Sequence, residues 1–132
     1  MKSITIDPTN QVNDVPFLCD RSEVRKVFGK KYSVIKKTPF SKNTTDVYDS
    51  FHIYYNADDK FEAIEIFGNV RVLVNDVVVF PGSKENIKKI FPEMVEDEYG
   101  LTDVKFSVGV TLNQDDEEII DGILFGCKGY YE

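Results

Sequence analysis

Four short apolar segments follow one another between residues 47 and 80, and this run constrains the fold more than any other feature of the chain. Val47–Tyr55 alternates mostly apolar odd positions with more polar even ones, as a strand with one buried face does. The turn-forming stretch Asn56–Asp59 separates it from Phe61–Phe67, so these two segments are predicted to pair as a hairpin. Val70–Val74 and Val77–Phe80 are almost wholly apolar, which predicts a second, more deeply buried hairpin.

A short helix is predicted before this region. Asp20 lies three residues before Glu23, which is a capping-box arrangement with Asp in the first position. Val24, Val27 and Phe28 then fall on one helical stripe. The pattern therefore predicts a helix that begins after Asp20 and packs this stripe on the sheet.

A second helix and two more strands are predicted after the apolar run. Ser83 is a suitable N-cap for a helix over residues 84–91, which Pro92 ends. Val104–Leu112 alternates apolar and small or polar residues throughout, so it is predicted to form a single strand. Ile119–Cys127 is predicted as the final strand, with glycines on one face that allow a close approach.

Strands joined by short turns, with helices set apart from them, are typical of an α+β domain. We predict one domain over residues 1–132: a mainly antiparallel, curved sheet of about six to eight strands with two short helices packed on it. The sequence reveals no internal repeat.

Charge is sorted along the chain. Residues 1–45 carry nine Lys/Arg against four Asp/Glu, residues 46–92 five against eight, and residues 93–132 two against eleven, within a net charge of −7. The acidic last third predicts a surface for a basic protein partner, unless the basic first third neutralises it within the fold. The net negative charge disfavours nucleic-acid binding.

The acidic residues of the last third form two clusters, one around Tyr99 and one in the turn after Leu112. The predicted partner-binding residues are Glu93, Glu96, Asp97, Glu98, Tyr99, Asp103, Asp115, Asp116, Glu117 and Glu118. A strand over residues 104–112 would hold the clusters about 30 Å apart, so they form one patch only if the sheet curls. Acidic loops with an exposed tyrosine steer a basic partner by charge and anchor it by aromatic contact.

His52 is the only histidine, and it is expected to share a sheet face with Tyr48 and Tyr54. A pocket under these three side chains is the alternative site, for a small ligand or an enzymatic reaction. No serine-nucleophile motif, zinc-ligand spacing, EF-hand loop or phosphate-binding glycine motif is present. We therefore predict no metal, no cofactor and no enzymatic activity.

The N-terminus and the cysteines bear on location. Residues 1–14 hold three charges and lack the apolar run of a signal peptide, and no apolar stretch approaches the roughly 20 residues of a membrane span. Cys19 and Cys127 are predicted to be reduced, mostly buried thiols rather than the single disulfide of a secreted protein. We expect a cytoplasmic protein that does not bind membranes.

Two stretches support a family resemblance. Residues 22–29 (SEVRKVFG) resemble the short helix that opens many small bacterial α+β proteins, and residues 51–67 resemble the aromatic hairpin that follows it. In size, acidity and lack of catalytic motifs the chain is similar to immunity proteins of bacterial toxin systems, including contact-dependent inhibition. The helix-then-strands pattern also resembles the outer-membrane assembly lipoprotein fold, but the chain lacks that family's signal and lipidation cysteine.

The immunity resemblance implies a cytoplasmic protein that binds and blocks a basic toxin, in many cases a nuclease. The leading hypothesis is therefore an immunity protein that binds a cationic toxin surface through its acidic last third. The second hypothesis is the small-ligand or enzymatic pocket at His52, Tyr48 and Tyr54. The third is an oligomeric module in which an apolar sheet edge pairs with itself.

Overall fold

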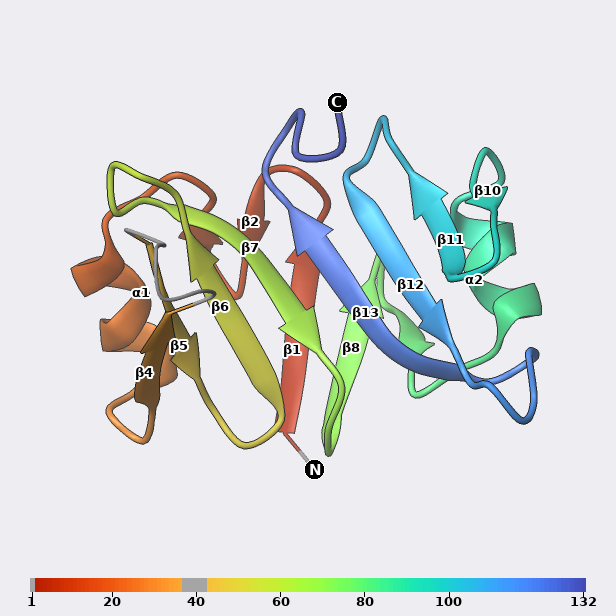
Figure 1. Ribbon diagram of the computed structural model, residues 1–132, viewed down its shortest axis with the longest axis horizontal. Helices are drawn as coiled ribbons and strands as arrows, with labels where there is room; N and C mark the ends of the chain where they lie inside the picture. The colour runs from red at the N-terminus through yellow and green to blue at the C-terminus, as the bar shows by residue number, and fades with distance from the viewer. Residues whose placement is uncertain (1, 37–42) are drawn as a thin grey trace.

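The computed structural model describes residues 2–36 and 43–132 and contains two β-sheets and two helices (Figure 1). In chain order the elements are β1 (Lys2–Asp7), β2 (Gln11–Val12), β3 (Val15–Pro16), α1 (Arg21–Phe28), β4 (Ser33–Lys36), β5 (Thr44–Val47), β6 (Phe51–Tyr55), β7 (Phe61–Ile66), β8 (Val70–Val74), β9 (Val77–Phe80), α2 (Lys84–Ile90), β10 (Val95–Glu96), β11 (Gly100–Asp103), β12 (Val108–Leu112) and β13 (Ile120–Gly126). The predicted α+β class is confirmed.

The larger sheet has eight strands in the order β10-β11-β12-β13-β7-β6-β5-β4, and the smaller has five in the order β3-β2-β1-β8-β9. The pairing of β1 with β8 is parallel, and the other described strand pairs are antiparallel. Sequence analysis anticipated a single sheet, so the second sheet is a finding of the structure. It forms because β1, at the N-terminus, pairs with β8 of the β8–β9 hairpin.

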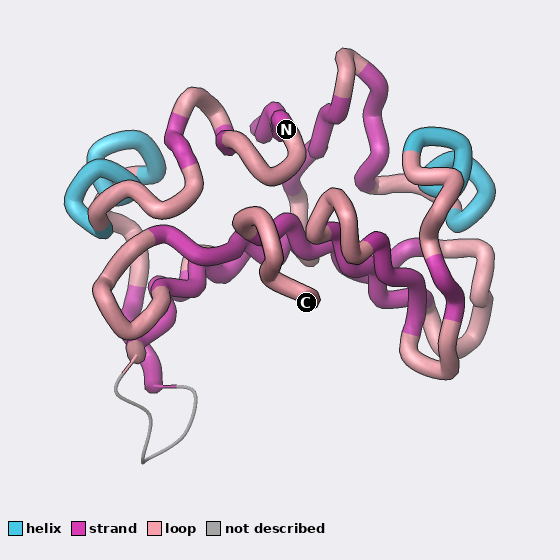
Figure 2. Tube along the Cα trace, turned by 90° about the horizontal axis from the view of Figure 1, so that it is seen from above, coloured by secondary structure: helices cyan, strands magenta, loops and turns pink. Residues whose placement is uncertain are grey.

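Seen from above in Figure 2, the large sheet arches. Both helices and the small sheet lie on its outer, convex side in this view, and its two edges bend away from them. Among residues 2–36 and 43–132, no helix or strand covers the opposite face of the large sheet, and the C-terminal segment is the part that crosses it.

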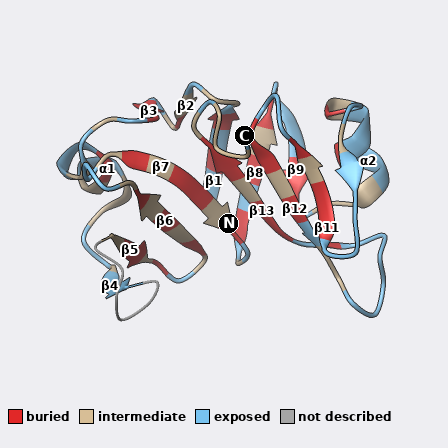
Figure 3. Ribbon diagram, turned by 45° about the horizontal axis from the view of Figure 1, so that its top comes forward, coloured by how far each residue is buried: buried red, intermediate tan, exposed pale blue. Residues whose placement is uncertain are grey.

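The core lies between the two sheets, and Figure 3 shows buried residues along the central strands β7 and β13. The core cluster includes Ile4, Ile6, Val72 and Val74 from the small sheet and Ile64, Ile66, Ile123 and Phe125 from the large one. Each fully buried side chain of this kind stabilises the fold by about 1.5–3 kcal/mol. Side chains on the covered face of the large sheet are therefore packed in the core, whereas side chains on the uncovered face remain accessible.

The order of elements repeats, which sequence analysis did not predict. Each half begins with a strand and its hairpin partner, to which the first half adds the two-residue strand β3. A helix follows, and then four strands that run as a meander from the edge of the large sheet to its centre. The halves meet where β7 pairs with β13. The helices retain a matching sequence, VRKVF at residues 24–28 and IKKIF at residues 87–91, and the first residue of each run is fully buried.

Backbone contacts at the start of each helix also match. The amide of Arg21 donates a hydrogen bond to the carbonyl of Asp59 (3.3 Å), and the amide of Lys84 donates one to the carbonyl of Glu118 (2.9 Å). Each helix therefore begins against the turn between the last two strands of its own half. Arg21 and Lys84 occupy equivalent positions.

The meanders align as well. β6 and β12 are five residues long, and each is followed by an asparagine, Asn56 or Asn113, whose side-chain oxygen accepts hydrogen bonds from amides of the turn. The third residue of each strand pairs with Asp46 of β5 in the first half and with Leu101 of β11 in the second. Asp46 and Leu101 are therefore equivalent positions, one charged and one apolar, and both are buried.

The two helices begin where predicted but are capped differently. The Ser83 side chain accepts a hydrogen bond from the amide of Asn86 (3.2 Å), as an N-cap does. The predicted capping box at Asp20 is wrong, because that side chain makes no capping hydrogen bond and instead forms an ion pair with Lys60.

The predicted strand over residues 104–112 is also wrong in its first half. Residues 104–107 form the turn between β11 and β12, and the side chains of Val104 and Phe106 are exposed there. The Asp103 carboxylate accepts a hydrogen bond from the amide of Phe106 (2.9 Å), and Ser107 has a positive φ of 55°. A side-chain hydrogen bond and a left-handed residue close the turn, although the apolar alternation continues through it.

Candidate functional site

The hairpin of β11 and β12 brings the two predicted acidic clusters together. Gly100 at the start of β11 lies opposite Thr111 near the end of β12. The acidic residues just before Gly100 and just after Leu112 therefore lie at the same end of the hairpin. The prediction that they lie at opposite ends of one strand is wrong, because the chain reverses between them.

Each acidic cluster is held by a turn with its own side-chain hydrogen bonds. The Asp97 carboxylate accepts hydrogen bonds from the amides of Tyr99 (2.8 Å) and Gly100 (3.0 Å). Asn113 accepts them from the amides of Asp115 and Asp116, both at 2.9 Å. These bonds shape the backbone and leave the neighbouring carboxylates turned to the surface.

A hollow of about 750 Å³ lies between the two turns. Its acidic lining residues are Glu96, Asp97, Glu98, Asp115, Glu117 and Asp121. Within residues 2–36 and 43–132, no lysine or arginine lines it. We call this set of residues, with Tyr99, the acidic hollow. Six carboxylates around one hollow create a strong negative potential that attracts cations over several ångströms.

A second, smaller hollow of about 180 Å³ adjoins the acidic hollow. Asp97, Tyr99, Gly100 and Thr111 line both. The smaller hollow continues across the uncovered sheet face towards Glu65 of β7. The Tyr99 side chain, 78% exposed, lies where the two hollows join.

The C-terminal segment forms the far wall of the smaller hollow. The Tyr131 side chain lines it and lies against Gly109, where an added Cβ atom would come within 2.0 Å of the tyrosine oxygen. The Tyr130 ring lies against Gly126 in the same way. The prediction that glycines of the final strand allow a close approach therefore holds at Gly126. Burial raises the pKa of Tyr131 to about 12, so it is neutral at physiological pH.

Three of the predicted partner-binding residues lie outside the lining of the acidic hollow: Glu93, Asp116 and Glu118. A fourth, Asp103, faces the core and is only 2% exposed, so its assignment to an exposed surface is wrong. Its register opposite the buried Val108 turns it inward.

Glu96 lines the hollow but already has cationic partners. Its carboxylate lies 2.8 Å from the ammonium of Lys84 and 3.4 Å from that of Lys88, both of α2. The hydrogen bond from Lys84 lowers the pKa of Glu96. These lysines neutralise one edge of the hollow, and the charge available to a partner comes from its other carboxylates.

Asp121 and Tyr131 were not among the residues singled out from the sequence, and Glu65 was not assigned to partner binding. Glu65 and Asp121 interrupt apolar strands, and such residues point to an uncovered sheet face in general rather than to this hollow. No local signal placed Tyr131, because its position depends on the C-terminal segment folding back over β12 and β13.

The alternative pocket at Tyr48, His52 and Tyr54 does not form as predicted. Tyr48 follows β5 and stacks on Phe51 in the core, where its hydroxyl donates a hydrogen bond to the carbonyl of Gly29 (2.8 Å). His52 and Tyr54 lie on the uncovered face, where their rings meet edge to face at 6.3 Å. Tyr48 lies in the turn between β5 and β6, so its side chain does not follow the alternation that places His52 and Tyr54 on the uncovered face.

Metal and thiol chemistry find little support among the described residues. No group of three or more His, Cys, Asp or Glu side chains in this part of the chain is placed to hold a metal ion. Cys19 and Cys127 are free thiols, and burial raises the pKa of each, which opposes the nucleophilic thiolate form.

No helix in the described ranges is long and apolar enough to cross a membrane. Comparisons of the chain with protein-family models, with curated proteins and with solved structures give no match.

Proposed function

We propose that this chain is a binding protein of the bacterial cytoplasm that neutralises a cationic toxin domain, as an immunity protein does. The partner's basic surface enters the acidic hollow, and the adjoining uncovered sheet face supports the remainder of the contact. The observation that carries the proposal is the gathering of six carboxylates, from segments that flank the β11–β12 hairpin and from β13, around a hollow with no described cation in its lining.

The surroundings of the hollow suit a protein partner better than a single bound ion. The acidic hollow and its smaller neighbour together form a long depression along the uncovered sheet face. The exposed Tyr99 side chain lies at the middle of this depression, and the half-buried Tyr131 side chain lies at its far end. Aromatic side chains next to complementary charge are typical of the residues that carry most of the energy in protein interfaces.

The chain's own cations leave most of this charge uncompensated. Arg21 and Arg25 of the basic first third form ion pairs with Asp46 and Asp59. Among the described lysines and arginines of residues 1–45, none forms an ion pair with a carboxylate of the acidic hollow. Exposed carboxylates of this kind accelerate association with a basic partner, and salt screens the effect over about 8–10 Å.

The proposal is tested by charge reversal on three residues that make no described side-chain hydrogen bond, Glu98, Asp115 and Glu117. The triple variant Glu98→Lys, Asp115→Lys, Glu117→Lys is compared with the parent chain against a toxin isolated with it from the native cell. Surface plasmon resonance at 50 mM and 300 mM salt measures the association rate and the affinity. We expect the variant to lose at least about 100-fold in affinity at low salt and much of the parent's salt dependence.

The control variant is Glu23→Lys with Glu85→Lys, which reverses exposed carboxylates on α1 and α2 outside the acidic hollow. It should lose far less affinity than the triple variant, and circular dichroism should show all variants folded. Unchanged binding by the triple variant would remove the acidic hollow from the interface and reject the proposal.

A further inference from the structure

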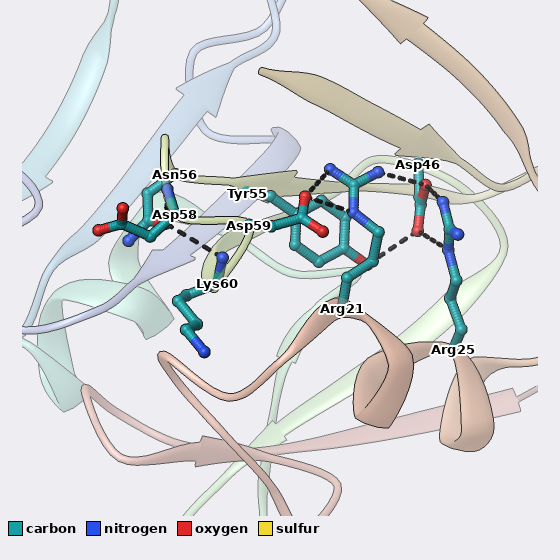
Figure 4. Close-up of polar contacts among 8 residues, drawn as sticks. All are labelled: Arg21, Arg25, Asp46, Tyr55, Asn56, Asp58, Asp59 and Lys60. Atoms are coloured by element: carbon teal, nitrogen blue, oxygen red, sulfur yellow. Dashed lines mark hydrogen bonds and ion pairs between the residues drawn. The ribbon is translucent and has the colours of Figure 1, made fainter. Parts of the chain in front are cut away.

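At the end of the molecule opposite the acidic hollow, α1 is joined to the large sheet by a buried carboxylate (Figure 4). Asp46 has no exposed surface, and its two oxygens accept hydrogen bonds from Arg25 Nη2 (2.7 Å) and Arg25 Nε (2.9 Å). The Tyr55 hydroxyl donates a third hydrogen bond, at 2.8 Å. Arg21 lies 3.6 Å away and forms its main ion pair with Asp59 in the β6–β7 turn.

The fold does not require this network. The equivalent positions in the second half are Leu101 in place of Asp46 and Leu112 in place of Tyr55, and Lys88 in place of Arg25 turns to the surface carboxylate of Glu96. Replacing a buried ion pair by apolar residues is often neutral or stabilising. The charged version in the first half therefore calls for an explanation other than stability.

The network holds two guanidinium groups rigidly at the wall of an open cavity of about 680 Å³. A guanidinium has five N–H donors. Arg25 uses two on Asp46, and Arg21 uses Nε and Nη2 on Asp59. Each arginine therefore keeps further donors at a cavity wall, already oriented by a carboxylate behind it.

The other lining residues complete a site for an anion. Lys26 and Lys30 add two more cations, and Lys30 makes no ion pair with a described residue. Arg25 lies over the Tyr32 ring at 4.3 Å, which limits the movement of both side chains. The carboxylates that line the cavity, Asp20 and Asp59, are already paired with Lys60 and Arg21. Because Arg25 is paired with Asp46 and Lys26 with Glu23, one positive charge, that of Lys30, is left for a ligand.

We propose that this cavity is a second binding site, which takes an oxyanion, a phosphate or carboxylate group of a small molecule, between Arg25 and Lys30. A planar guanidinium offers two parallel N–H donors that match such a group, and Lys30 supplies the balancing charge. The site is separate from the acidic hollow and independent of the toxin partner proposed above.

The test is isothermal titration calorimetry of the whole chain with sodium phosphate and with sodium acetate, at a constant ionic strength kept with chloride. Binding of phosphate assigns a phosphate ligand, and binding of acetate assigns a carboxylate ligand. In either case Lys30→Gln should weaken the binding about tenfold, which corresponds to the loss of one charge-assisted hydrogen bond.

The matched control is Lys105→Gln, which removes the same charge from the β11–β12 turn, far from the cavity in sequence and outside its lining. It should leave the affinity unchanged. The proposal is overturned if neither anion binds, or if Lys30→Gln and Lys105→Gln weaken binding equally, because the effect would then reflect net charge rather than this cavity.

Discussion

The two halves of the molecule use the same architecture but place their charges differently. In the first half, the two arginines of the helix form ion pairs with Asp46 and Asp59, and the Asp46 carboxylate that Arg25 meets is fully buried. In the second half, Leu101 fills the equivalent position, and Lys84 and Lys88 pair instead with Glu96, whose carboxylate is partly exposed. The same arrangement of helix and meander is therefore compatible with either a buried ion pair or an apolar contact.

This difference explains why the charge sorting in the sequence becomes a feature of the surface. Several carboxylates of the first half, Asp20, Asp46 and Asp59, have cationic partners within that half. In the second half only Glu96, among the carboxylates that line the acidic hollow, forms a described ion pair. These carboxylates of the first half are neutralised by cations of the same half, whereas most carboxylates of the acidic hollow have no such partner among the described residues.

The largest effect is expected when the buried carboxylate is removed. Asp46→Ala leaves Arg25 and the Tyr55 hydroxyl without their acceptor in the protein interior. Breaking a buried pair in this way costs about 3–5 kcal/mol, and urea unfolding followed by circular dichroism measures it. Asp58→Ala, at an exposed turn position, is the control. A loss below about 1 kcal/mol would show that the network does not hold α1 to the sheet.

The matching change in the second half should cost somewhat less. Leu101→Ala removes a side chain that is 1% exposed and leaves a cavity in the core. We expect a loss of about 3 kcal/mol in the free energy of unfolding, measured by the same urea titration. Because only apolar contacts are lost, the loss should hardly change between low and high salt. A strong salt dependence would contradict the apolar description of this half.

Converting the first half to the apolar chemistry of the second should be nearly neutral. The triple variant Asp46→Leu, Arg25→Met, Tyr55→Leu removes the buried carboxylate together with both of its hydrogen-bond donors. None of these three groups is then left without a partner. We expect stability within about 1 kcal/mol of the parent, or higher. Differential scanning calorimetry measures it. A loss close to that of Asp46→Ala would show that the two halves are not interchangeable at this position.

Alkaline pH should weaken the first half through its buried tyrosines. Burial raises the pKa of Tyr48 to about 12, above the value near 10 of an unfolded chain, so the folded state keeps a proton that the unfolded state loses. The stability that this tyrosine contributes is complete below pH 10 and declines between pH 10 and 12. Tyr48→Phe should be less sensitive over this range in urea titrations at pH 8, 10 and 11. Parallel curves for the two proteins would contradict the assignment.

The smallest effect is expected at the surface pair of the second half. Lys84→Gln removes the ion pair with Glu96 at 2.8 Å, and pairs with a partly exposed carboxylate contribute little to stability. The urea midpoint should not change measurably at 0.15 M salt. The variant should also increase the negative charge of the acidic hollow. A large drop in stability would show that this pair acts as the buried pair of the first half does.

The elements that sequence analysis predicted correctly carry their signals within a few residues. The α2 N-cap at Ser83 and the β6–β7 hairpin around Asn56–Asp59 need only local hydrogen bonds and alternation to be recognised. The β11–β12 turn was missed because Val104 and Phe106 continue the apolar alternation, although both are exposed. In the structure Asp103 supplies the acceptor side chain of this turn, and Ser107 supplies its left-handed backbone. In the sequence, the apolar alternation outweighed these two turn-compatible residues.

The repeat and the acidic hollow show a second limit of sequence analysis. The VRKVF and IKKIF runs lie 63 positions apart, in two helices whose neighbouring strands and turns differ in sequence. The duplication is recognised from the repeated order of elements and from the matching backbone contacts of Arg21 and Lys84. The candidate site residues were mostly identified, but their spatial relation was not. Asp97 and Asp115 share a hollow because one hairpin reverses the chain between them.

The α+β class, both helices, about half of the strands and the acidity of the last third can be read from the sequence alone, because these follow from periodicity, caps and charge over short windows. Which carboxylates face solvent together and which are buried became known only from the three-dimensional arrangement of the strands. It placed Asp46 against Arg25, turned Asp103 into the core and set Tyr99 between two hollows. Those outcomes depend on which strand pairs with which, and pairing across tens of residues leaves no local mark on the chain.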